Sequence, residues 1–135
     1  MSAPIDLSPR AISQLVESLA RFSAPGPGVT RFVYDDHWCD AQRWLAAEAE
    51  ARGLAATRDA AGNLYLHDPG VAAGATVILT GSHLDTVREG GTLDGAYGAI
   101  AGLLLAAALR GSTRVPVVGI SESAGCSRRP TPPSR

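Results

Sequence analysis

One short stretch of the sequence concentrates side chains that can bind metals or move protons. It begins at Gly81 and has the sequence Gly-Ser-His-Leu-Asp-Thr-Val, which places His83 two positions before Asp85, and Asp94 follows shortly after. A neutral imidazole and carboxylates that one loop brings together are suitable ligands for Zn²⁺, Mn²⁺ or Co²⁺. Asp85 could instead orient the ring of His83, or a water molecule, from behind the metal ligands.

Two other interpretations of this stretch stay open on the residues alone. A histidine beside two aspartates is also typical of a cluster that caps or stabilises a loop. Several glycines surround the predicted start of a helix, where free backbone N–H groups favour a phosphate: Gly90, Gly91, Gly95, Gly98 and Gly102. The sequence has neither the P-loop lysine with its Ser or Thr nor the dinucleotide-binding glycine pattern in its proper frame, so anion binding is the weaker alternative.

The elements around this stretch are expected to present it at one edge of an α/β sheet. Residues 77–80 are a short β-branched and aliphatic run, typical of a buried parallel strand, and residues 115–120 form another. Small residues from 96 to 109 lie between them and predict a helix. A strand, a helix and a strand in this order imply a right-handed crossover, which places residues 81–95 at the carboxyl end of the first strand.

Two helices and a hairpin are predicted upstream of the crossover. Ser8 before a proline is an N-cap signal, and apolar residues then recur at helical spacing over residues 9–22. A second helix is predicted from about residue 37 to 52, capped by Asp35 or Asp36. Its apolar face is formed by Trp38, Ala41, Leu45 and Ala49. Two strand-like segments, residues 54–58 and 63–67, flank a turn-forming sequence and predict a hairpin.

Length and composition restrict the class of protein. The 135 residues are 45% hydrophobic and 19% charged, with a formal net charge of −1, which fits one domain with its own core. The balanced charge excludes an electrostatic footprint for nucleic acid or an anionic membrane. The N-terminal residues do not resemble a signal peptide and there are two cysteines, so the expected location is the cytoplasm. Residues 123–135 are rich in proline and predict a disordered tail.

Several motifs in order closely resemble the N-carbamoyl-L-amino-acid hydrolase and allantoate amidohydrolase family, the carbamoylase branch of the aminoacylase-like metallohydrolases. The stretch from Gly81 to Val87 matches, as do the following Gly-Gly and Asp94-Gly. Upstream, the matching segments are Gly28-Val29-Thr30-Arg31, Tyr34, Ala41-Gln42 through Trp44-Leu45, Gly53-Leu54, and the Asp-Ala-Ala-Gly-Asn-Leu of residues 59–64. The resemblance covers about residues 10–120. It implies an α/β fold, the N-terminal part of a three-layer αβα catalytic domain with its sheet incomplete.

The resemblance also implies a dinuclear metal site and a substrate class. Members of the family use two divalent ions, Zn²⁺, Mn²⁺ or Co²⁺, bridged by an aspartate, and a water attacks the amide or carbamoyl carbon. By position, His83 resembles a terminal metal ligand, Asp94 the bridging carboxylate and Asp85 the residue that supports His83 from behind. The implied substrates are small N-carbamoyl-L-amino acids or ureido acids such as allantoate. Full-length relatives are expected to be homodimers.

The sequence departs from the family after the strand at residues 115–120. Family members place two adjacent glutamates there, a general base and a metal ligand, before a glycine. Ser123 and Ala124 stand at those positions, and Glu122 could be the base only if the register shifts by one residue. We therefore expect residues 1–122 to form a partial catalytic domain with weak or no metal binding and no turnover on its own. The alternative is a non-catalytic remnant or interaction fragment of such an enzyme.

Overall fold

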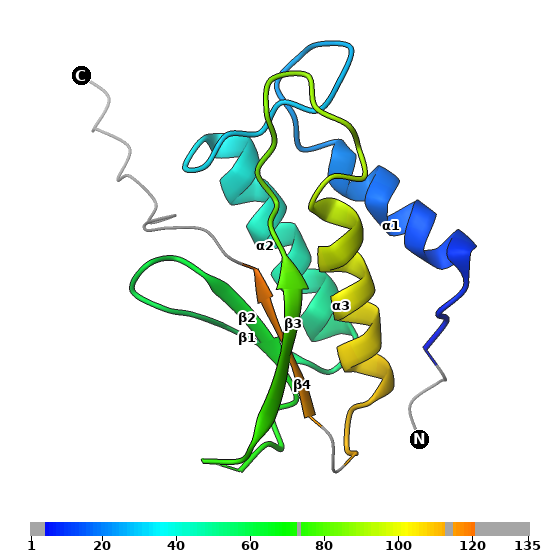
Figure 1. Ribbon diagram of the computed structural model, residues 1–135, viewed down its shortest axis with the longest axis vertical. Coiled ribbons are helices and arrows are strands. Elements are labelled where there is room, and N and C mark those ends of the chain that lie inside the picture. The colour runs from blue at the N-terminus through cyan, green and yellow to red at the C-terminus, as the bar shows by residue number, and fades with distance from the viewer. Residues whose placement is uncertain (1–4, 73, 113–114, 121–135) are drawn as a thin grey trace, which may run out of the picture.

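The computed structural model describes residues 5–72, 74–112 and 115–120, which form three helices and one four-stranded sheet (Figure 1). In chain order the elements are α1 (Pro9–Ala20), α2 (Asp36–Ala51), β1 (Ala55–Arg58), β2 (Leu64–His67), β3 (Val77–Ser82), α3 (Ala96–Ala108) and β4 (Val115–Ile120). All the predicted helices and strands are confirmed, and their bounds agree within two residues. None of the helices described here is long and apolar enough to cross a membrane.

The sheet combines a hairpin with a parallel pair of strands. Its order is β1-β2-β4-β3, in which β1 pairs with β2 and β2 with β4 in antiparallel fashion. β3 and β4 are parallel, with Val77 opposite Val115 and Ser82 opposite Ile120. Since α3 connects these two strands along the chain, the predicted strand–helix–strand unit is confirmed.

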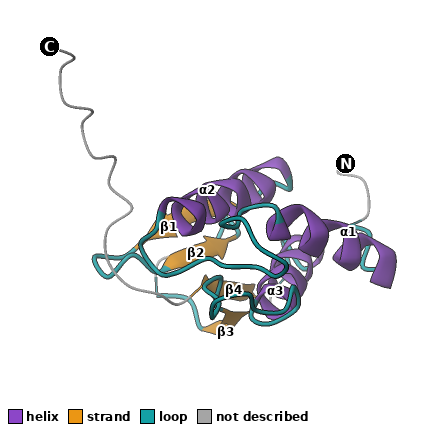
Figure 2. Ribbon diagram, turned by 90° about the horizontal axis from the view of Figure 1, so that it is seen from above, coloured by secondary structure: helices purple, strands orange, loops and turns teal. Residues whose placement is uncertain are grey.

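The helices cover one face of this sheet (Figure 2). On that face Leu64 and Leu66 of β2 lie opposite Ile120 and Val118 of β4, and all four side chains are completely buried. α2 packs against β1 and β2, α3 packs against β3 and β4, and α1 lies against α3. The predicted apolar face of α2 is confirmed by the complete burial of Trp38, Ala41, Leu45 and Ala49. The described residues thus form two layers of an α/β domain.

β3 differs from its prediction as a buried strand. Its residues Val77, Ile78 and Leu79 are 42%, 59% and 65% exposed. β3 is the edge of the sheet and pairs with β4 alone among the described strands. α3 approaches the strand at Ser82 and Thr80, which lie 2.8 and 3.7 Å from Cβ atoms built on Gly98 and Gly102. The parallel pairing was predicted correctly, but the burial was not, because an apolar run does not reveal whether another element covers it.

One carboxylate organises the turn between β1 and β2. Asp59 accepts hydrogen bonds from the backbone N–H groups of Ala61 and Asn63 at 3.0 and 2.9 Å. It also accepts from the side-chain amide of Asn63 at 2.7 Å and from the hydroxyl of Tyr65 at 3.2 Å. The side-chain hydrogen bond from Asn63 is the main cause that lowers the pKa of Asp59 below its ordinary 3.8.

We expect Asp59→Ala to lower the melting temperature at neutral pH, because these donors lose their common acceptor. The folded state holds the ionised carboxylate, so its contribution is present above the ordinary pKa of 3.8 and is lost as the pH falls through the lowered folded pKa. The difference in melting temperature between wild type and variant should therefore close in acid. Thermal scans by circular dichroism at several pH values measure this difference, with Glu50→Ala on α2 as the control. A difference that stays constant in acid would contradict the assignment.

Candidate metal centre

The loop between β3 and α3 carries the three side chains predicted to form the site. His83 directly follows Ser82, the last residue of β3, and Asp94 directly precedes Gly95, the N-cap of α3. The loop therefore starts at the carboxyl end of a parallel strand and ends at the first turn of the crossover helix (Figure 1). This is the position in which open α/β sheets place their ligands, as the order of elements predicted.

Asp85 holds one ring nitrogen of His83. Nδ1 of His83 lies 3.0 Å from the backbone carbonyl oxygen of Asp85 and 3.2 Å from the carboxylate Oδ1 of the same residue. A neutral imidazole that donates from Nδ1 to this carbonyl leaves Nε2 unprotonated. Metal-binding histidines are commonly held in this way, with one nitrogen fixed from behind and the other free to bind. His83 is thus within hydrogen-bond distance of Asp85, and the supporting role suggested for Asp85 stays a prediction.

Gly95 brings the start of α3 into contact with the same ring. Its φ is +66°, and a Cβ built on it would lie 2.4 Å from the carbonyl oxygen of His83 and 2.6 Å from ring atoms Cε1 and Nδ1. A side chain at position 95 would therefore collide with the imidazole ring and with the carbonyl oxygen of His83. Asp94, which is exposed, is the chain neighbour of this closely approaching glycine.

The side chains of His83 and Asp94 are of types that bind divalent metals, but they are fewer than an ordinary site requires. An imidazole with one nitrogen held from behind and a neighbouring carboxylate are suitable ligands. Among the residues that the structure describes, however, no group of three His, Cys, Asp or Glu side chains could hold a metal ion. An ordinary catalytic zinc site has three protein ligands. Glu122, Ser123 and Ala124 lie outside the described residues, and so does the predicted tail at 123–135.

Sequence reasoning missed a buried arginine behind this loop. Arg31 is 1% exposed, and its guanidinium Nε donates to the carbonyl oxygen of Leu84 at 2.7 Å. Leu84 lies between His83 and Asp85 in the sequence, so Arg31 contacts the backbone that links these two residues. The available signal was the position of Arg31 within one of the segments that match the family, which by itself assigned it no role.

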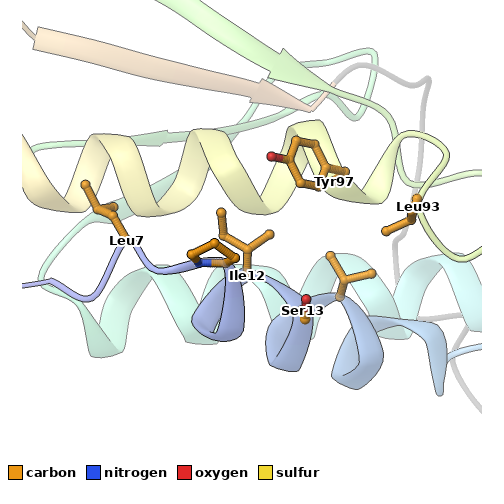
Figure 3. A pocket seen from close by; sticks show the side chains of 7 residues that line it. Leu7, Ile12, Ser13, Leu93 and Tyr97 are labelled. Atoms are coloured by element: carbon orange, nitrogen blue, oxygen red, sulfur yellow. The ribbon is translucent and has the colours of Figure 1, made fainter.

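A separate apolar pocket lies between α1 and the start of α3 (Figure 3). It has a volume of about 450 Å³. Its lining consists of Leu7, Pro9, Ile12, Ser13, Val16, Leu93 and Tyr97. Leu93 and Tyr97 come from either side of the turn that contains Asp94, but none of the predicted site residues lines the pocket. The pocket is therefore distinct from the candidate metal centre.

Curated proteins similar to this chain are amidohydrolases of ureido and carbamoyl compounds. Allantoate amidohydrolase of Bacillus subtilis (strain 168) is 41% identical over 95 residues, which cover 70% of this chain and 23% of the relative. The allantoate amidohydrolase of Escherichia coli (strain K12) is 40% identical over 96 residues, again 70% of this chain and 23% of the relative. N-carbamoyl-L-amino-acid amidohydrolase of Paenarthrobacter aurescens is 39% identical over 92 residues, 68% of this chain and 22% of the relative. The chain thus spans less than a quarter of these relatives.

Solved structures give the same result. A hydantoinase/carbamoylase family amidase from Burkholderia ambifaria superposes with a TM-score of 0.76 at 29% identity, over 86% of this chain and 30% of the other. One from Burkholderia vietnamiensis gives a TM-score of 0.77 at 27% identity, over 91% of this chain and 31% of the other. No family model matches the chain. By sequence and by fold, this chain is similar to the N-terminal portion of amidases of the hydantoinase/carbamoylase family.

Proposed function

We propose that the function is metal-dependent hydrolysis of a linear amide or carbamoyl C–N bond in an N-carbamoyl-L-amino acid or an allantoate-type ureido acid. The observation that carries the proposal is the imidazole of His83, which Asp85 holds at Nδ1 beside the turn that bears Asp94. Relatives named for allantoate and N-carbamoyl-L-amino acids support the substrate class. A ureidoglycolate hydrolase of Oryza sativa subsp. japonica, 33% identical over 103 residues, supports it further.

Each of the three side chains has a distinct part in this proposal. Nε2 of His83 and the exposed carboxylate of Asp94 would hold a metal, and Asp85 keeps the proton of the imidazole on Nδ1. A divalent ion held there would supply Lewis acidity, which lowers the pKa of water and polarises a substrate carbonyl. We propose Zn²⁺, Mn²⁺ or Co²⁺ as the metal, because these ions accept both imidazole and carboxylate ligands. We further propose a homodimer, which the resemblance implies for full-length relatives, and a cytoplasmic location, which fits a chain with two cysteines.

A second candidate is a non-catalytic remnant or an interaction fragment of such an enzyme. One observation favours it, namely that the described part of the chain contains no group of three metal-binding side chains. Under this hypothesis the contact between His83 and Asp85 stabilises the loop, and no metal binds through Nε2.

Metal titration of the demetallated protein separates the two candidates. We expect calorimetry with Zn²⁺, Mn²⁺ and Co²⁺ to show weak binding, which His83→Ala and Asp94→Asn abolish because each removes one of two ligands. His67→Ala is the matched control, since Nδ1 of His67 likewise lies 3.2 Å from a backbone carbonyl, that of Asp68, on a half-buried ring outside the loop. Ammonia release from N-carbamoyl amino acids and allantoate is measured on the same samples.

The pattern of loss decides between the candidates. Binding that survives in His67→Ala and disappears in both loop variants supports the metal centre. Binding that is absent from the wild type, or that is the same in all four proteins, contradicts the metal-dependent function and favours the remnant.

A further inference from the structure

A buried guanidinium joins the end of α1 to the middle of the candidate metal centre. Nε of Arg31 donates to the carbonyl oxygen of Leu84 at 2.7 Å. Nη1 donates to the carbonyl oxygens of Leu19 and Phe22, at 3.0 and 2.8 Å, where α1 ends. The carbonyl group of Leu84 is far in the sequence from the two carbonyl groups at the end of α1. One side chain therefore sets the position of the peptide group between His83 and Asp85 relative to α1.

The backbone on either side of Arg31 is bonded to the same loop. The N–H of Arg31 donates to the hydroxyl of Thr86 at 3.0 Å, and the N–H of Thr86 donates to the carbonyl of Arg31 at 2.8 Å. The Thr86 hydroxyl donates in turn to the carbonyl of Val29 at 2.9 Å. Val29 and Gly90 exchange two backbone hydrogen bonds at 3.0 and 2.8 Å. Residues 29–31 thus form a fixed border along the loop.

The hydrogen bonds of Arg31 do not require its positive charge. All three hydrogen bonds of the guanidinium go to neutral carbonyl oxygens, which a neutral donor could also satisfy. Burial lowers the pKa of Arg31 to about 10, against the attraction of the carboxylates of Asp35 and Asp85. A buried cation is costly to retain, and the attraction of the carboxylates of Asp35 and Asp85 offsets part of that cost.

We propose that Arg31 is a positioning residue for the candidate metal centre. By fixing the carbonyl of Leu84 and attracting the carboxylate of Asp85, it sets the direction from which Asp85 meets Nδ1 of His83. Arg31 acts through Asp85 and contacts neither metal nor substrate. The inference rests on the proposed function, in which Nε2 of His83 is the atom that binds the metal. In this proposal Arg31 determines which ring nitrogen of His83 carries the proton.

The test measures that proton directly. Long-range ¹H–¹⁵N spectra of the metal-free protein show which nitrogen of His83 is protonated, and we expect Nδ1–H in the wild type. Arg31→Met removes the charge and the fork of donors, and Arg31→Lys keeps the charge without the fork. We expect both variants to show a mixture of tautomers, more evenly divided in Arg31→Met. We also expect their zinc dissociation constants to rise by about 10- to 100-fold, as for other groups that hold a metal ligand from behind.

A second destabilised variant distinguishes a positioning role of Arg31 from a general loss of stability. Leu45→Ala removes a completely buried side chain of α2, away from the loop, and should lower the urea midpoint while leaving the His83 tautomer unchanged. If Arg31→Met does not fold, Arg31→Lys carries the comparison.

Unchanged tautomers in folded Arg31 variants would overturn the proposal, and so would an equal change in Leu45→Ala. A wild-type protein that does not bind zinc would instead contradict the proposed function. The tautomer measurement would still test the role of Arg31 in that case.

Discussion

Replacement of Gly81 by alanine is expected to separate β3 from the sheet. Gly81 has a φ of +146° and pairs with Gly119 of β4. A Cβ at this position would lie 1.9 Å from the backbone oxygen of Gly119 and 2.8 Å from its carbonyl carbon. Backbone atoms in a paired strand cannot rotate away as a side chain can, so the two strands must move apart. We expect the free energy of unfolding to fall by about 3 kcal/mol or more, from conformational strain and lost ladder hydrogen bonds together.

Urea denaturation measures this loss, and two other glycines separate its causes. Gly74→Ala also places alanine at a positive φ, +79°, but the added Cβ would meet no atom within 4 Å, so this variant reports a conformational cost without a clash. Gly91→Ala likewise adds a methyl group in open space, at a backbone conformation that suits any residue. The expected order of stability is Gly91→Ala, then Gly74→Ala, then Gly81→Ala. Equal midpoints for Gly81→Ala and Gly74→Ala would show that the strands tolerate the contact.

Gly95→Ala is expected to damage the candidate metal centre while the sheet stays intact. The new Cβ would lie 2.4 Å from the carbonyl oxygen of His83 and 2.6 Å from its ring, at a φ of +66°. Because α3 is anchored by buried residues such as Ile100 and Leu103, we expect the loop, and with it the imidazole, to yield. A displacement of about 1 Å in a site can cost about 100-fold in rate, and we expect metal affinity to fall on the same scale.

Metal titration and ammonia release compare Gly95→Ala with Gly91→Ala, which lies in the same loop. The left-handed conformation alone costs an alanine at position 95 about 1–2 kcal/mol, and the contact with the backbone oxygen of His83 adds to that cost. Far-ultraviolet circular dichroism checks the fold. A Gly95→Ala protein that binds metal as the wild type does would show that the contact between Gly95 and the ring is not needed for the site.

The parts of the fold that depend on local pattern could be predicted from the sequence. Ser8 caps α1 by accepting from the N–H of Ala11, and Asp35 caps α2 by accepting from the N–H of Trp38, as their residue types suggested. The buried face of α2 followed from residues spaced three or four apart, because that spacing defines one side of a helix. The position of His83 at the end of β3 followed from the order of strand, loop and helix.

The parts that depend on distant segments could not be predicted in this way. The apolar run at Ile78 and Leu79 has the same sequence whether or not another element covers it, and its exposure appears only in the assembled sheet. Arg31 is a charged residue in a loop, which favours an exposed position. It is buried because carbonyl groups from the end of α1 and from Leu84 converge on it, and nothing local to residue 31 indicates that convergence. The metal-binding roles of His83 and Asp94 stay predictions.

The border between residues 29–31 and the loop after β3 also has a consequence for the order of folding. Its hydrogen bonds join residues 53 to 61 positions apart in the chain, from Arg31 with Leu84 to Val29 with Gly90. Closing a loop of that length costs chain entropy before any contact is gained, whereas the helices and the β1–β2 hairpin form from near neighbours. We therefore expect the secondary structure to form early and His83 to acquire its fixed orientation among the last events of folding.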